Sequence, residues 1–424
     1  MRHKQLIPAI LLAMAPWAAT AQDTTAPTEA HVPETAAYSA PAPAAEAPKS
    51  DLPDWVEKLP KVSGFAQVRY SRFATPEKAT LHEASKFELP NIRLAVGSRK
   101  PWDTVIGDIG YKAEIDVASG LKVKDVYVEV MPRKYIGLRV GQFKTPFLFA
   151  GLVSETKLQT IDNALAKKTL GYGRDVGAQL QGSTDIVKDK LAVNYALGMF
   201  NGEGEGAWAA PKESAYLIGN VNDKFLYAGR VALDILGGTD MDEADLIGKC
   251  KQWVNTGDEC TDKRTLRATV GGGLVRNKHN AMSDKKPEWG GDETRWAVDG
   301  HVKYYGLSLS GEYGQGTLVP DTGADINRAA YFTQLGYAPG LLPWLEVVGR
   351  HEYSDANTDA KANDGKLQGI YRESVGLNLY AMGHNAKLMF DYAIYNGSED
   401  DKAGLRKAVA ANADRFRVQM HVGF

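Results

Sequence analysis

The chain has 424 residues, with 50 lysines and arginines against 52 aspartates and glutamates and a formal net charge of -2. This balance argues against a nucleic-acid-binding protein with a broad basic face, and the lack of any run of about 18 apolar residues excludes a protein that crosses a membrane by helices. The 43 glycines, 19 tyrosines and only 2 cysteines suit a β-rich protein outside the cytoplasm.

Residues 1–21 have the pattern of a cleavable signal peptide. Arg2 and Lys4 precede a short apolar stretch, and the small residues Ala19 and Ala21 flank Thr20 in a cleavage motif. Because the apolar stretch is too short to span a bilayer, we interpret it as an export signal and not an anchor.

Residues 22–61 are predicted to form a periplasmic tether. The segment is rich in Ala, Pro, Thr and Glu, and it holds too little apolar mass to offset the entropy of ordering. A short helix is expected at 51–61. The division is therefore a signal peptide (1–21), a disordered tether (22–61) and a folded region (62–424).

From residue 62 onward the chain alternates apolar and polar residues with period two, which predicts β-strands. In the last segment Phe416, Val418 and Met420 share one face, whereas Arg417 and Gln419 share the other. Sixteen such segments are predicted: 62–72, 88–99, 104–117, 121–131, 135–143, 174–182, 190–200, 224–236, 264–277, 294–304, 305–315, 328–338, 342–354, 369–381, 384–396 and 414–424.

The connections between these segments alternate between long and short. A transmembrane β-barrel has long loops outside and short periplasmic turns, and an even strand number puts both termini on the periplasmic side. The exception is the acidic segment 237–263, which should be a turn but is long. It is either an inserted periplasmic excursion or a missed strand pair, so eighteen strands remain an alternative.

The alternation favours an antiparallel up-and-down membrane barrel over a soluble β-sandwich. No second layer is apparent to cover the apolar faces, and the polar faces carry charges that a packed core would not accept cheaply. In lipid every backbone N–H and C=O group must be hydrogen-bonded, so a β-sheet can cross the membrane only if it closes into a barrel. Aromatic residues gather near strand ends, as at membrane interfaces: Tyr70, Trp102, Tyr135, Tyr172, Tyr304, Tyr305, Trp344, Tyr353 and Tyr395.

Three segments, VSGFAQVRYSR (62–72), VGQFKTPF (140–147) and GYGRDVGAQLQG (171–182), resemble the phosphate-selective porin O and P family. The terminal Phe424 is similar to the insertion signature of outer-membrane barrels. The resemblance covers 62–424 in order and spacing. It implies a sixteen-stranded, trimeric outer-membrane porin whose third loop enters the lumen, with arginines and a lysine cluster that attract phosphate or polyphosphate.

The connection 143–173 is too long for a passive turn and is the candidate constriction. Up to Arg174 it holds five basic residues, Lys144, Lys157, Lys167, Lys168 and Arg174, against two acidic ones. Leu158, Ile161 and Leu165 have helical spacing, which predicts a short helix that packs on the inner wall and directs the lysines at the lumen. The alternative is a solvated surface loop.

Strand parity also places basic residues on the lumen side, where guanidinium groups suit phosphate or carboxylate oxygens. The candidates are Arg69, Arg93, Arg139, Arg230, Lys303 and Arg417. Carboxylates have the same parity, so ion-pair bracing of the inner wall is the alternative interpretation: Asp108, Glu114, Glu129, Asp234, Asp299, Glu312, Glu346 and Asp391.

Cys250 and Cys260 are predicted to form a disulfide, since the chain is exported to an oxidising compartment. A metal site is the alternative, although zinc usually takes four ligands and that segment has no histidine.

No H-E-x-x-H, phosphate-binding loop or G-x-S-x-G motif occurs, and we predict no enzyme, cofactor or metal. The expected protein is a passive outer-membrane porin for small anions, with membrane lipid as its surroundings, no nucleic-acid partner and a homotrimeric assembly. The alternatives are a general porin, a surface barrel enzyme such as a lipase or protease, and an adhesion protein.

Overall fold

A computed structural model describes residues 59–73, 85–98, 102–202, 204–205, 224–246, 266–279, 291–358, 369–396 and 414–424. The predicted signal peptide, nearly all of the predicted tether, and both cysteines lie outside these residues. No helix in the described part of the chain is long and apolar enough to cross a membrane.

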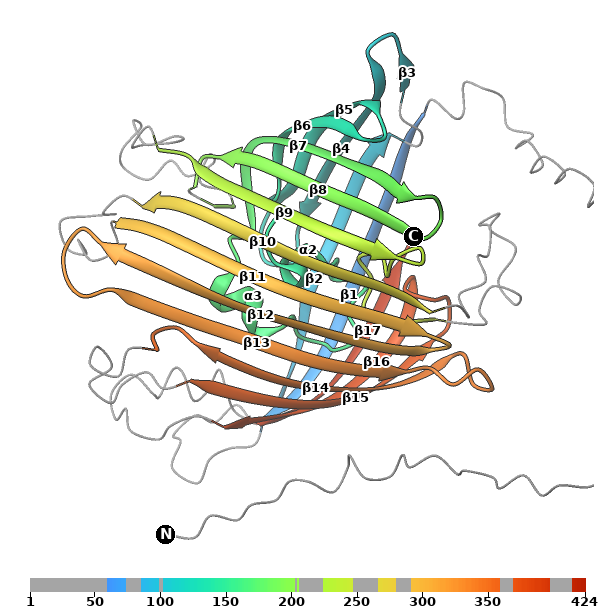
Figure 1. The fold of residues 1–424 in the computed structure, drawn as a ribbon. Helices are drawn as coiled ribbons and strands as arrows, with labels where there is room; N and C mark the ends of the chain where they lie inside the picture. The colour runs from blue at the N-terminus through green and yellow to red at the C-terminus, as the bar shows by residue number, and fades with distance from the viewer. Residues whose placement is uncertain are drawn as a thin grey trace, which may run out of the picture. The chain divides into compact units, whose positions relative to one another are not determined.

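The described residues form one antiparallel sheet (Figure 1). Its strands are β1 (Pro60–Phe73), β2 (Ser85–Ser98), β3 (Trp102–Thr104), β4 (Gly107–Asp116), β5 (Lys122–Arg133), β6 (Ile136–Lys144), β7 (Arg174–Val187), β8 (Leu191–Phe200), β9 (Leu226–Ile235), β10 (Arg267–His279), β11 (Gly291–Tyr304), β12 (Leu307–Pro320), β13 (Ile326–Tyr337), β14 (Leu345–Asp355), β15 (Ile370–Tyr380), β16 (Ala386–Asn396) and β17 (Arg415–Gly423).

The sheet closes into a barrel because β1 pairs with both β2 and β17. The short strand β3 pairs with β4 alongside β2, so the ring has sixteen positions among the described residues. Strand β9 pairs directly with β10, which leaves no place between them for another strand pair. The prediction of a sixteen-stranded antiparallel barrel is therefore confirmed, and the eighteen-stranded alternative is wrong.

The two faces of the strands differ as the period-two pattern predicts. On β11, Val298 and Val302 are exposed on the outside, whereas Asp299 and His301 are buried on the lumen side. Apolar groups on the outside and polar groups inside are the arrangement of a barrel surrounded by lipid. Tyr304 at the turn end of β11 is half exposed on the outside, at the level where aromatic rings border the headgroups.

The constriction loop, residues 145–173 between β6 and β7, folds inside the barrel. Its two helices, α2 (Phe149–Leu152) and α3 (Leu165–Leu170), lie within the ring of strands in Figure 1. Leu170 packs in a cluster of buried apolar residues with Phe143, Phe147 and Phe200. The helix predicted across Leu158, Ile161 and Leu165 does not form, since residues 157–164 are irregular and α3 starts only at Leu165.

Candidate pore constriction

Carboxylates on the barrel wall hold the backbone of the constriction loop. Glu312 on β12 accepts hydrogen bonds from the amides of Phe149 (2.6 Å) and Ala150 (3.1 Å) at the start of α2. Glu352 on β14 accepts one from the amide of Leu165 (3.0 Å) at the start of α3. Both helices are short and have unsatisfied amides at their first turns, so a carboxylate there removes a desolvation cost.

Basic side chains of the wall donate hydrogen bonds to carbonyl oxygens of the same loop. The pairs are Lys387 to Leu158 (2.6 Å), Arg350 to Asp162 (2.9 Å), Arg372 to Asn163 (2.8 Å) and Arg295 to Leu170 (2.6 Å). These contacts explain the missing helix at 158–165. Helical hydrogen bonds would need the Leu158 and Asp162 carbonyls, but charged wall groups occupy them, and charge-assisted hydrogen bonds are the stronger kind.

Both carboxylates of the constriction loop are engaged in ion pairs. Glu155 contacts Lys167 of α3 (3.0 Å between Oε1 and Nζ). Asp162 contacts three arginines of the wall: Arg372 (3.1 Å), Arg415 (3.1 Å) and Arg417 (2.6 Å). Burial alone raises the pKa of the Asp162 carboxyl, but the three guanidiniums outweigh burial and hold that pKa well below its ordinary value.

The pKa of Glu155 gives a testable pH dependence. Burial raises this pKa, but Lys167 and Arg93 outweigh burial and hold it at about 2, against an ordinary value of 4.5. A carboxyl with a lowered folded-state pKa stabilises the fold above its ordinary pKa, and that contribution is lost as pH falls toward 2. The Glu155 carboxyl is therefore ionised at pH 4 as well as at pH 7. Glu155→Gln removes this negative charge, so we expect it to shift the reversal potential toward anions at both pH values. If the difference from the wild type fell to about a quarter at pH 4, the carboxyl would have its ordinary pKa of 4.5.

Three basic residues of this region have no carboxylate partner among the described residues. Lys144 donates to the carbonyls of Leu152 and Val153 (2.8 Å each) and forms no ion pair there. Lys157 is half-buried, and Lys168 on α3 is exposed. The positive surplus that the sequence indicates is thus concentrated on Lys157 and Lys168, whereas Lys144 is held among backbone carbonyls.

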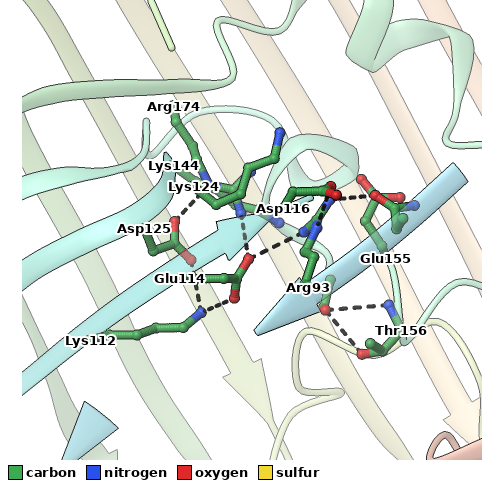
Figure 2. Close-up of polar contacts among 12 residues, drawn as sticks. Arg93, Lys112, Glu114, Asp116, Lys124, Asp125, Lys144, Glu155, Thr156 and Arg174 are labelled. Carbon is green, nitrogen blue, oxygen red and sulfur yellow. Dashed lines mark hydrogen bonds and ion pairs between the residues drawn. The ribbon is translucent and has the colours of Figure 1, made fainter. Parts of the chain in front are cut away.

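The predicted lumen-side arginines and Arg174 contact carboxylates of the inner wall. Figure 2 shows one network, in which Arg93 contacts Glu114 (3.4 Å) and Asp116 (3.3 Å), Lys112 contacts Glu114 (2.7 Å) and Asp125 (2.9 Å), and Arg174 contacts Asp125 (2.7 Å). Elsewhere the pairs are Arg69 with Glu88 (3.2 Å), Arg139 with Glu129 (2.6 Å), Arg230 with Asp299 (2.6 Å) and Arg417 with Asp391 (2.7 Å). These pairs are the contacts that the bracing interpretation requires.

The segment after β9 contacts the constriction loop, which the sequence did not indicate. Residues 236–246, here called the inner segment, enter the lumen and meet the constriction loop. Glu243 accepts a hydrogen bond from the amide of Gln159 (2.8 Å) and contacts Arg350 (3.2 Å), and Asp245 contacts Arg267 (2.7 Å). In the sequence, only the acidity and the unusual length of 237–263 marked this segment. Neither property shows whether the segment folds into the lumen or away from the barrel.

A cavity of ≈ 320 Å³, here called the inner cavity, lies between the constriction loop and the wall formed by β5 to β9. The loop itself is held against β11 to β17 by the contacts above. The inner cavity is lined by Asp125, Tyr127, Arg139, Phe143, Lys144, Pro146, Leu152, Gln179, Asn194, Tyr195, Ala196, Arg230, Ala232 and Met241. Open space therefore remains on the side of the barrel opposite the loop's anchors.

Residues 61–200 match the family model of phosphate-selective porin O and P, and no curated protein matches the chain. Among solved structures the fold is similar to OprB of Pseudomonas putida, with a TM-score of 0.54, 10% identity and coverage of 87% of this chain and 95% of that one. It is also similar to OmpT of Vibrio cholerae in its trimer form, with a TM-score of 0.52, 11% identity, and 86% and 99% coverage.

An anion-selective porin from Comamonas acidovorans is similar as well, with a TM-score of 0.52, 14% identity, and coverage of 86% of this chain and 99% of that one. Identities this low show a shared fold alone. The resemblance to the family is nevertheless confirmed: the chain has the fold of outer-membrane porins and matches the phosphate-selective porin O and P model over residues 61–200.

Proposed function

We propose that the chain is a passive diffusion channel of the bacterial outer membrane that prefers small anions, phosphate among them. The supporting observation is the unequal pairing of charges at the constriction. Glu155 and Asp162 are neutralised by ion pairs, whereas Lys144, Lys157 and Lys168 contact no carboxylate among the described residues. Unpaired positive charge in a narrow, low-dielectric pore raises the local concentration of anions and repels cations.

The mechanism needs no conformational step. A hydrated anion diffuses into the wide lumen and gives up part of its water at the constriction, where lysine ammonium groups replace it. It leaves readily because each contact is a single point charge and not an enclosing ring of donors.

A general porin without ion preference is the second candidate. The pairing of nearly all predicted inward arginines with carboxylates favours it, and so does the acidic inner segment. In that case the basic residues brace the wall, and the net field along the pore stays small.

Reversal potentials in a KCl gradient across a planar lipid bilayer distinguish the two candidates. We expect the wild type to prefer chloride, and the double variant Lys157→Gln, Lys168→Gln to lose about half or more of that preference because two unpaired charges are removed. Lys188→Gln, an exposed lysine at a turn between β7 and β8, is the matched control. Cation preference in the wild type, or equal potentials in all three proteins, would rule out the anion proposal.

We also propose that residues 1–21 are an export signal, that residues 22–61 form a periplasmic tether, and that Cys250 and Cys260 form a disulfide. Homotrimeric assembly is supported by the trimer form of the similar OmpT, and its test is the mass of the purified protein in detergent before and after heating.

A further inference from the structure

The inner cavity has a pronounced apolar side. Tyr127 and Phe143 meet edge to face, with ring centroids 6.1 Å apart and planes at 82°. Pro146 and Leu152 of the constriction loop and Met241 of the inner segment complete this side. A hollow of a few hundred cubic ångströms with apolar walls and a few polar groups is typical of sites for small organic molecules.

The polar side of the cavity has unused hydrogen-bonding capacity. Lys144 uses two of its three N–H donors on the carbonyls of Leu152 and Val153. Nε of Arg230 and Oε1 of Gln179 have no hydrogen-bond partner among the described residues, but both atoms are closed to solvent, so the third N–H of Lys144 is the donor left for a solute.

The acidic group of this cavity is already engaged. Asp125 contacts Arg174 (2.7 Å) and Lys112 (2.9 Å), so its charge is balanced by two cations of the wall. Arg139 is paired with Glu129 and lies over the Tyr127 ring, 4.4 Å from its centroid. Arg230 is paired with Asp299, so Lys144 is the basic group of the cavity that has no carboxylate partner among the described residues.

We propose that the inner cavity is a binding site for small organic monocarboxylates with an aromatic or short apolar body. The carboxylate accepts a hydrogen bond from the third N–H of Lys144, and the apolar body lies against Tyr127, Leu152 and Met241. Inorganic phosphate fits this cavity poorly, since a strongly hydrated ion loses water against the apolar side without gaining partners there. This inference rests on the proposed channel and names a preferred class of solute.

Block of single-channel current tests the site. The probes are benzoate, its neutral analogue benzamide, and inorganic phosphate, each added to the full-length channel in a bilayer in KCl. We expect benzoate to reduce the current at about tenfold lower concentration than either benzamide or phosphate, because only benzoate has both the charge and the apolar body.

Two substitutions at one position give the matched comparison. Met241 contacts neither α2 nor α3 through a hydrogen bond, so its replacement leaves the loop anchors in place. Met241→Leu keeps the apolar wall and should retain the wild-type benzoate block. Met241→Asp adds a negative charge to the cavity and should raise the half-blocking benzoate concentration about tenfold.

The outcomes separate this inference from the proposed function. A chloride-selective channel in which phosphate blocks as well as benzoate, or in which Met241→Asp and Met241→Leu behave alike, overturns the monocarboxylate site and leaves the channel proposal intact. A benzoate block that weakens in Met241→Asp supports the site even if the KCl reversal potential shows no anion preference. A protein that conducts no current overturns both.

Discussion

Replacement of residues 150–168 of the constriction loop by a short Gly-Ser linker should raise the single-channel conductance several-fold. The loop and its two helices occupy the lumen, and the open space lies on one side of it. The wall groups that hold the loop, such as Glu312, Arg350 and Lys387, would face water after its removal, so the barrel should still fold.

Folding of the linker variant is checked by heat-modifiable electrophoretic mobility, since a closed barrel migrates differently from its unfolded chain. The control is Lys188→Gln, which changes a turn outside the lumen. A folded linker variant with wild-type conductance would contradict the assignment of this loop as the narrowest part of the pore.

The second large effect is expected from Asp162→Asn. This change keeps the shape of the side chain but removes the charge that balances Arg372, Arg415 and Arg417. Arg417 keeps Asp391 and Arg372 keeps Glu352 as partners, whereas Arg415 loses the carboxylate it contacts. The constriction gains one net positive charge, so the reversal potential in a KCl gradient should shift toward anions. The loop should also lose an anchor and show more current noise, because guanidiniums in a low-dielectric site repel each other once the carboxylate is gone.

The matched control for this change is Asp185→Asn. Asp185 pairs with Lys134 (2.8 Å), and both side chains are largely exposed at the turn end of the barrel, where an ion pair contributes little. Its removal should leave both selectivity and noise unchanged. An Asp162→Asn channel with the control's reversal potential would mean that the arginine cluster does not face the conduction path.

Local sequence patterns were sufficient to predict the barrel. Alternation along segments such as 414–424 depends only on the two-residue repeat of a strand, and the alternation of long and short connections depends only on the side of the membrane. Hence the sixteen strands, the lumen-side parity of Arg93 and Arg417, and the position of the third long loop could all be predicted before any contact was known.

The partners of these residues could not be predicted, because parity indicates a face and not a neighbour. Asp162 meets Arg417, which is far away along the chain, only because ring closure and strand register bring β17 beside the loop. The same contacts override the local helical spacing of Leu158, Ile161 and Leu165, since wall groups such as Lys387 take the carbonyls a helix would use.

The amino-acid sequence by itself determined a closed ribbon of strands with lipid outside, polar residues inside and a long basic loop between β6 and β7. Tertiary structure alone decided that the loop's carboxylates are neutralised, that the acidic inner segment enters the lumen, and that open space lies against β5 to β9. The physical reason is the range of the interactions. Strand patterning is set by neighbouring residues, whereas charge balance inside the barrel is set by side chains brought together by closure of the ring.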